Sequence, residues 1–83
     1  MLVRVAPGGV IPRHVHDVAT ETTLVVSGHG ELRLDVDENG NAKNVVQWEA
    51  GRGGSIPPGL YHSVQNTGDE PLEILAIHSP PTR

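Results

Sequence analysis

Clusters of glycine and proline divide the chain into short segments, and this spacing of turns limits the fold more than any other feature. The clusters lie at residues 6–9, 27–30, 38–41, 51–54, 57–59 and 66–71. The segments between them are rich in valine, leucine, isoleucine and threonine, and none has apolar residues at helical spacing over a useful length. Short strands separated by turns at this frequency predict an all-β sandwich or barrel.

The apolar residues of these segments follow two different patterns. In residues 31–37, Leu32, Leu34 and Val36 alternate with charged residues, which predicts a strand with one face in the core and one in water. Residues 22–26 and 72–77 are instead apolar on both faces, which is typical of strands covered on both sides. In so small a chain the second cover could be another subunit.

The chain is short and has few large side chains for a core. Its 83 residues predict a single domain over residues 1–83, and a domain of this size buries only about 60–65% of the surface of its unfolded chain. Trp48 and Tyr61 are the only aromatic residues besides histidine, and cysteine is absent. Since disulfides are excluded, we expect a metal ion, a partner subunit or both to stabilise the fold.

The charge distribution excludes some classes of partner. The formal net charge is −4 and no run of basic residues could follow a phosphate backbone, so we expect no nucleic-acid binding. The first residues lack the apolar core and cleavage pattern of a signal peptide, and no segment is long and apolar enough to span a bilayer. A chain without cysteine or a targeting signal is expected in the cytoplasm.

Three side chains that often bind metals lie close together near the start of the chain. His14 and His16 are two residues apart, so on a strand they point to the same side and could hold one ion between them. The pair alone is explained at least as well by two polar residues on an exposed strand face that bind no metal. Glu21 is an odd number of residues from His16, so it can join the histidines only if the strand is broken within residues 17–20.

A third histidine, His62, follows a Pro-Pro-Gly turn, and the spacing around it completes a resemblance. Pro58 and Gly59 suit the central positions of a type II turn, after which a strand would begin near His62. The chain resembles the two sequence motifs of the cupin family, and it matches them at all ten fixed positions. The first motif consists of Gly8, His14, His16, Glu21 and Gly28, and the second of Gly51, Pro57, Gly59, His62 and Asn66.

The resemblance implies a fold and a site. The fold is an all-β, antiparallel double-stranded β-helix, the small jelly-roll barrel of single-domain cupins. The resemblance also implies a homodimer, in agreement with the strands that are apolar on both faces. The site is one divalent metal ion inside the barrel, and its implied ligands are His14, His16, Glu21 and His62. The motif glycines are expected at turns, where positive φ or close packing is required. Asn66 opens an Asn-Thr-Gly turn, and we interpret it as a turn former and not a ligand.

Three imidazoles and one carboxylate are ligands of intermediate hardness, which suit Fe, Mn, Ni, Cu, Co and Zn. The sequence does not choose among these ions. The cupin resemblance implies a metal-dependent enzyme acting on a small molecule, such as a dioxygenase, isomerase, decarboxylase or lyase, and oxidative chemistry is our first hypothesis. The alternatives are a non-catalytic binding or regulatory module that holds a metal or small molecule, and a purely structural metal.

Four further aromatic and histidine residues are candidates for the pocket. We expect Tyr61 to point outward, because it adjoins His62 on a strand. Trp48 is expected in the core and His29, within a Gly-rich turn, on the surface. His78 ends the last strand before Ser-Pro-Pro, and we predict that it is a surface histidine and does not face the barrel mouth.

The rest of the pocket is predicted to be modest in size and rather apolar. Val25, Val64 and Ile74 are expected among its lining residues. Arg13 and Arg52 carry charges that would suit an anionic substrate, but nothing in the sequence places either residue at the pocket.

Overall fold

The computed structural model describes residues 1–79, which form eight β-strands. Their bounds are β1 Leu2–Val5, β2 Val10–His14, β3 Thr20–Ser27, β4 His29–Val36, β5 Ala42–Glu49, β6 Gly53–Ile56, β7 His62–Asn66 and β8 Leu72–Ser79. Within this part of the chain, no helix is long and apolar enough to cross a membrane.

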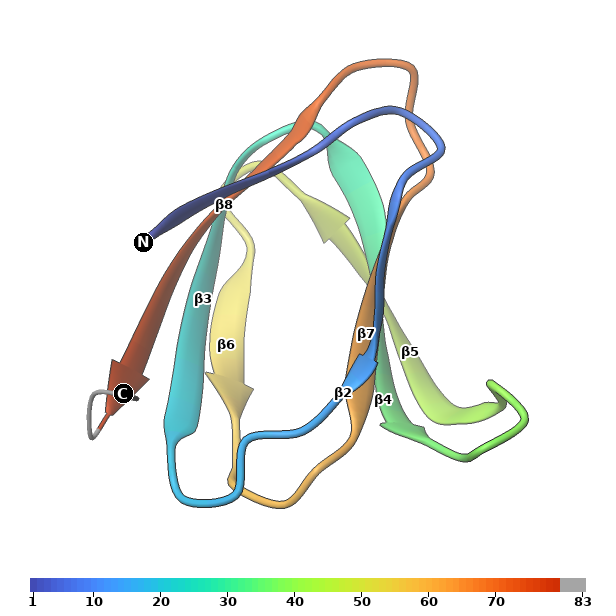
Figure 1. The fold of residues 1–83 in the computed structure, drawn as a ribbon. Helices are drawn as coiled ribbons and strands as arrows, with labels where there is room; N and C mark the ends of the chain where they lie inside the picture. Colours follow the sequence, from blue (N-terminus) through green and yellow to red (C-terminus); the bar gives the residue numbers. More distant parts are fainter. Residues whose placement is uncertain (80–83) are drawn as a thin grey trace.

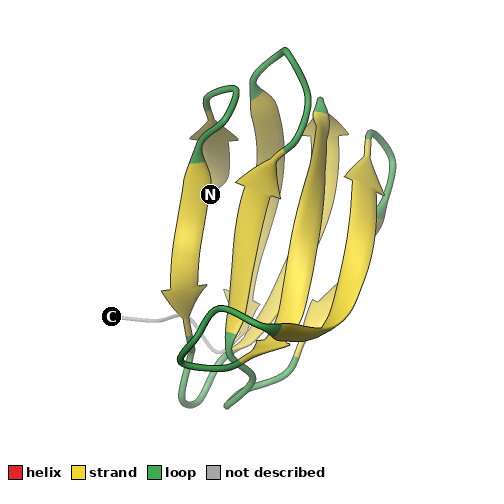
Figure 2. Cartoon of the chain, turned by 90° about the vertical axis from the view of Figure 1, so that its right-hand side faces the viewer, coloured by secondary structure: helices red, strands yellow, loops and turns green. Residues whose placement is uncertain are grey.

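The strands form two four-stranded sheets, ordered β1-β8-β3-β6 and β2-β7-β4-β5, which face each other (Figures 1 and 2). Neighbouring strands are antiparallel in both sheets. The chain passes repeatedly between the sheets, and β4 and β5 form a hairpin within the second one. This arrangement confirms the predicted fold, an all-β double-stranded β-helix.

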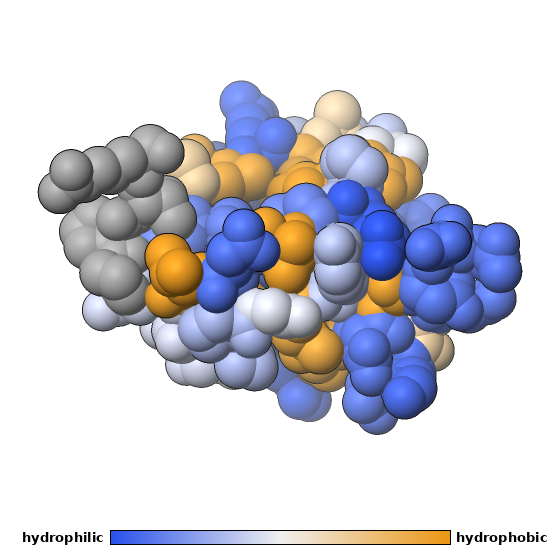
Figure 3. Space-filling model, turned by 60° about the horizontal axis from the view of Figure 1, so that its bottom comes forward, coloured by the Kyte–Doolittle hydropathy of each residue, from blue (hydrophilic) through white to orange (hydrophobic). Residues whose placement is uncertain are grey.

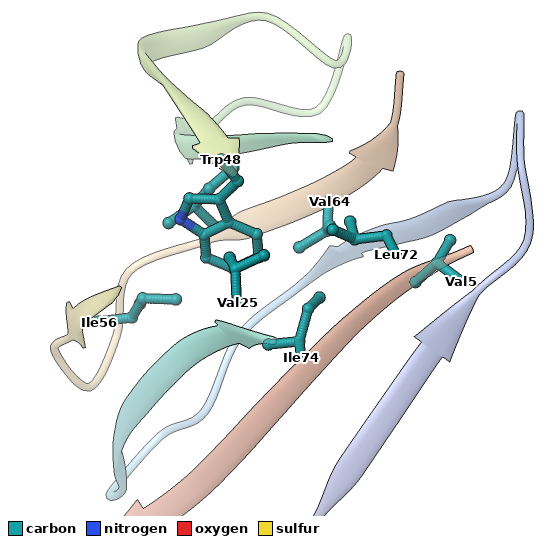
Figure 4. Close-up of a cluster of buried hydrophobic side chains, with 8 residues drawn as sticks. Val5, Val25, Trp48, Ile56, Val64, Leu72 and Ile74 are labelled. Carbon is teal, nitrogen blue, oxygen red and sulfur yellow. The ribbon is translucent and has the colours of Figure 1, made fainter. Parts of the chain in front are cut away.

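The core lies between the two sheets and follows the alternation of side chains along the strands (Figure 4). Trp48 is only 4% exposed, as expected for a core residue. Val25, Val64 and Ile74 also point inward and are buried, together with Leu72 from β8. Because these side chains come from both sheets, the contact between them closes the structure around a single interior.

The outer face of the first sheet carries exposed apolar side chains. Leu75 on β8 is paired with Leu2 on β1 and with Leu24 on β3, so three leucines form a row across neighbouring strands. These three residues, and the nearby Val26 and Ile77, are between 38% and 60% exposed. The segments predicted to be apolar on both faces are therefore buried on one face, while within residues 1–79 nothing covers the other.

Turn residues of the two motifs have the backbone conformation that the sequence predicts. The four motif glycines all have positive φ, and they are Gly8, Gly28, Gly51 and Gly59. Gly28 connects β3 in one sheet with β4 in the other, at a point where the chain passes close to β8. A Cβ atom at this position would lie 2.6 Å from the carbonyl oxygen of Pro71, so only glycine fits the junction.

Asn66 also acts as a turn residue. Its side chain is 2% exposed, and its Nδ2 donates to the carbonyl oxygens of Val5 at 2.9 Å and Glu70 at 2.7 Å. The N–H of Gly68 donates to its Oδ1 at 2.9 Å. The amide thus holds the turn after β7 and ties it to the end of β1, in agreement with the interpretation from sequence.

Replacing Gly28 is expected to destabilise the fold more than replacing Gly40. Both residues have positive φ, 91° and 84°, so Gly28→Ala and Gly40→Ala each carry a backbone cost of about 1 kcal/mol. Only the new Cβ at position 28 meets backbone atoms, since nothing lies within 4 Å of the one at position 40. We expect Gly28→Ala to lose roughly 1–3 kcal/mol more in urea unfolding. Equal losses would show that the close approach to Pro71 is unimportant.

Candidate metal centre

His14 and His62 lie directly opposite each other on neighbouring strands. β2 ends at His14 and β7 begins at His62, and the two residues are paired in the antiparallel register. Their ring centroids are 4.1 Å apart. They therefore meet at one end of the sheet, the lower end in Figure 1, although 47 residues separate them in the sequence.

Backbone carbonyls fix the orientation of both rings. The Nδ1 of His14 lies 2.8 Å from the carbonyl oxygen of Pro12, and that of His62 lies 2.9 Å from the oxygen of Leu60. Because a carbonyl oxygen only accepts, each Nδ1 must carry the proton and donate it. The Nε2 of each neutral ring is then left with a lone pair directed into the site, which is the tautomer that a metal ligand requires.

His16 and Glu21 reach the same place because the chain leaves the strand between them. β2 ends before Val15, and β3 begins at Thr20, so residues 15–19 form a loop and the predicted break exists. The break starts earlier than expected, since His16 itself lies in the loop. The N–H of Gly59 donates to the carbonyl oxygen of His16 at 2.9 Å, which connects this loop to the Pro-Pro-Gly turn before β7.

Four side chains predicted to be ligands converge. One potential ligand atom from each of His14, His16, Glu21 and His62 lies within 4.8 Å of the others. Glu21 Oε1 is 3.4 Å from His16 Nε2, and its Oε2 is 3.7 Å from His62 Nε2. The set of three imidazoles and one carboxylate could hold a metal ion.

The hydrogen bonding of the site supports this interpretation. Among buried side-chain nitrogen and oxygen atoms of the described residues, only His16 Nε2 and His62 Nε2 have no hydrogen-bond partner. A buried polar atom without a partner costs about 1–3 kcal/mol, so such atoms are rare unless another group satisfies them. Both atoms face the cluster, and a bound cation would accept their lone pairs.

His78 also belongs to this site, and the prediction that it is a surface residue is wrong. It lies on β8 directly opposite Glu21 on β3, and its Nε2 is 2.8 Å from Glu21 Oε1. Its side chain is only 14% exposed. The alternation along β8 explains this position, because His78 falls on the same inward face as Leu72, Ile74 and Ala76.

A cavity of about 300 Å³ adjoins the five side chains. Its other walls are apolar apart from Thr23, and they consist of Met1, Val3, Ile11, Trp48, Val64, Ile74 and Ala76. Val64 and Ile74 line it as the sequence predicts, whereas Val25 is buried in the core and is not among the lining residues. Figure 3 turns this end of the molecule toward the viewer and shows hydrophilic side chains next to smaller hydrophobic areas.

Other candidates lie away from the cavity. Arg13 stacks on the ring of the outward-facing Tyr61, with its guanidinium carbon 3.7 Å from the ring centroid. Arg52 lies beside Glu49, and His29 is exposed as expected. Neither arginine is therefore placed to meet a molecule bound next to the histidines.

Comparison with known proteins identifies the family. The model of the family described as "Cupin domain" matches residues 1–78. Germin-like protein 5-1 of Oryza sativa subsp. japonica is 38% identical over 77 residues, which cover 89% of this chain and 32% of that protein. Oxalate decarboxylase OxdC of Bacillus subtilis is 34% identical over 76 residues, which cover 92% of this chain and 19% of that protein. The chain thus spans a third or less of these two relatives.

The fold has a similar counterpart among solved structures. A crystal structure of a Bacillus halodurans protein superposes with a TM-score of 0.90 at 26% sequence identity. The match covers 99% of this chain and 61% of the other.

Burial changes how His62 binds protons. Removal from water lowers the pKa of His62 below its ordinary value of 6.5, and the neighbouring His14 ring adds to this effect. The hydrogen bond to the Leu60 carbonyl acts in the opposite direction without reversing it. The neutral ring, with its Nε2 lone pair available, is therefore favoured over the imidazolium.

This shift predicts that the metal-free protein loses stability on mild acidification. Below about pH 6.5 the unfolded chain protonates this histidine while the folded chain does not, so the free energy of unfolding falls until the folded pKa is reached. Urea unfolding with a chelator, between about pH 7.5 and pH 5.0, should show a shallower decline for His62→Gln than for the parent. His29→Gln is the control, since His29 is exposed. Identical slopes in all three proteins would contradict the assignment.

Proposed function

The chain belongs to the cupin family, and we propose that it is a metal-dependent enzyme. It would bind one divalent transition metal ion and act on a small molecule. The proposed ligands are His14, His16, Glu21 and His62. The observation that carries the proposal is the pair of buried Nε2 atoms, on His16 and His62, that have no hydrogen-bond partner and face a cavity. Buried polar atoms of this kind are retained in proteins mainly where function requires them.

The donor set suits a first-row transition ion such as Fe, Mn, Co, Ni, Cu or Zn. Such an ion would supply Lewis acidity and, if redox-active, a route for electrons. The protein's own residues hold the imidazole rings in the right tautomer through the Pro12 and Leu60 carbonyls. A carboxylate ligand from Glu21 would offset one unit of the ion's charge, and this would favour higher oxidation states. We therefore propose oxidative, dioxygenase-like chemistry as the first reaction class.

The cavity indicates what kind of molecule would fit. A volume of about 300 Å³ admits a small metabolite, and most of the walls are apolar. Within residues 1–79, no lysine or arginine is among the lining residues. A molecule with an apolar body and one or two oxygen or sulfur donors suits these walls better than a compact dianion, whose charges only the ion would balance. Catechols, thiols and diketones are therefore the substrate classes that we propose first.

Metal analysis tests the first step of the proposal. Purified parent protein should carry one equivalent of a transition ion, or take up one after loading, and His62→Ala should lose it because the most buried ligand is removed. Glu21→Gln is a second variant that keeps the side-chain volume and removes the charge. His29→Ala should bind metal as the parent does. A parent protein that accepts no divalent ion would contradict both an enzyme and a metal-binding module.

Oxygen consumption separates an enzyme from a binding module. Iron-loaded protein should consume oxygen in the presence of one of the three substrate classes, and the rate should fall to background in His62→Ala. Oxalate belongs in the panel because one relative is named as its decarboxylase, and its turnover would release carbon dioxide without net oxidation. No turnover with any compound, together with tight binding of one of them, would instead support the non-catalytic module.

We also propose a homodimer formed through the outer face of the first sheet. The leucine row of Leu2, Leu75 and Leu24 is centred on Leu75, so a twofold axis through that point would place like surfaces on each other. Flat sheet faces pack well against each other, as the two sheets of one subunit already do. A second copy of this chain is therefore the occupant that we propose for the face.

Light scattering after size exclusion tests the dimer. The parent should have twice the mass of one chain, and Leu24→Glu should have the mass of one, because a carboxylate at the contact would be buried without a partner. Val45→Glu is the matched control, since Val45 is 47% exposed on the other sheet and Leu24 is 45% exposed on this one. A monomeric parent, or a dimer that survives Leu24→Glu, would contradict this interface.

A further inference from the structure

His78 and Glu21 form the shortest contact between side chains at the site. They are cross-strand partners on β8 and β3, and 2.8 Å separates His78 Nε2 from Glu21 Oε1. Both side chains are largely withdrawn from water, at 14% and 13% exposed. A hydrogen bond to a carboxylate in such a place is stronger than one on the surface, because water competes less for the two partners.

We infer that His78 is a positioning residue, which holds one oxygen of Glu21 so that the carboxylate meets a bound ion through the other oxygen. The inference rests on the proposed metal site and adds a fifth residue to it. Neither motif contains His78, and the four-residue cluster does not include it. Its role would be to set the orientation of a ligand, and not to bind the ion itself.

The tautomers of the histidines separate these two roles. An ionised carboxylate has no proton to give, so His78 Nε2 must carry the hydrogen of the bond to Glu21. In His14 and His62 the protons lie on Nδ1, where the backbone carbonyls accept them, and their Nε2 atoms keep lone pairs. A nitrogen that donates a proton cannot at the same time give its lone pair to a cation. In this arrangement His78 is a donor, while the other two rings are potential ligands.

The two oxygens of Glu21 differ accordingly. Oε1 lies 2.8 Å from His78 Nε2 and 3.4 Å from His16 Nε2, whereas Oε2 lies 3.7 Å from His62 Nε2. Of the two, only Oε1 accepts a side-chain hydrogen bond from the described residues. This hydrogen bond favours one orientation of the carboxylate, and it leaves Oε2 as the oxygen without a hydrogen-bond donor among the described side chains. Residues that orient a metal ligand in this way typically change metal affinity by about 10–100-fold when they are removed.

Two substitutions at position 78 test the inference through metal binding. In glutamine, the amide nitrogen lies as many bonds from Cβ as Nε2 does in histidine, so His78→Gln keeps a donor near Oε1, whereas His78→Ala removes it. Affinity for Co²⁺ is measured by competition with a chromogenic chelator, and the visible spectrum of the Co²⁺ form reports the coordination. His29→Ala is the control, because that histidine is exposed outside the cavity.

We expect His78→Ala to weaken Co²⁺ binding by about 10–100-fold and to change the spectrum, since a freed carboxylate can use both oxygens. His78→Gln should retain most of the affinity and the parent spectrum. If both variants lose affinity and show the same altered spectrum, His78 is itself a ligand and the inference is overturned. Unchanged affinity in His78→Ala overturns it as well, while leaving the proposed metal site intact.

A measurement on metal-free protein examines the hydrogen bond directly. Nitrogen-15 spectra that detect ring protons should find the hydrogen of His78 on Nε2 and those of His14 and His62 on Nδ1. A proton on Nδ1 of His78, with a bare Nε2, would overturn the inference. A parent that shows the expected tautomers but binds no Co²⁺ would overturn the proposed function and, with it, any role of His78 toward a metal.

Discussion

The candidate site depends on imidazole nitrogens that are buried and lack a partner. Protein interiors seldom leave such atoms unpaired, because each loses its hydrogen bonds to water without replacement. The two unpaired atoms are His16 Nε2 and His62 Nε2. In His62, as in His14, a backbone carbonyl holds the proton on Nδ1, so Nε2 keeps its lone pair and cannot donate to a neighbour. A cation is the partner that accepts several lone pairs at once, and Glu21 supplies a negative charge beside it.

The fold brings these groups together through strand pairing and not through proximity in sequence. β2 pairs with β7, which places His14 against His62, and β3 pairs with β8, which places Glu21 against His78. The two pairs belong to opposite sheets that share one core, so the site forms only when the sheets face each other. The same arrangement leaves an apolar cavity beside the site, and binding of an ion would stabilise the folded chain over the unfolded one.

Much of this could be predicted from the sequence, and the exceptions have physical reasons. Periodicity and turn residues give the strands, and the two motifs give the fold and the four converging side chains. The odd spacing between His16 and Glu21 requires a break in the strand before Glu21. The spacing does not determine where the break starts, and the loop begins already at residue 15. The sequence predicts a surface position for His78 because a strand end followed by prolines is usually exposed. The even spacing of His78 from Ile74 and Ala76 nevertheless places it on the inward face of the strand. Which strands are neighbours, and hence the contact with Glu21, depends on long-range pairing that local patterns do not encode.

A crystal structure of the metal-loaded protein, with an anomalous difference map at the absorption edge of the ion, would show directly whether the three imidazoles and the carboxylate hold one ion. We expect one peak within coordination distance, about 2.0–2.2 Å for zinc, of the Nε2 atoms of His14, His16 and His62 and of an oxygen of Glu21. A fully loaded crystal with its peak elsewhere, or with those three nitrogens hydrogen-bonded to water alone, would contradict it.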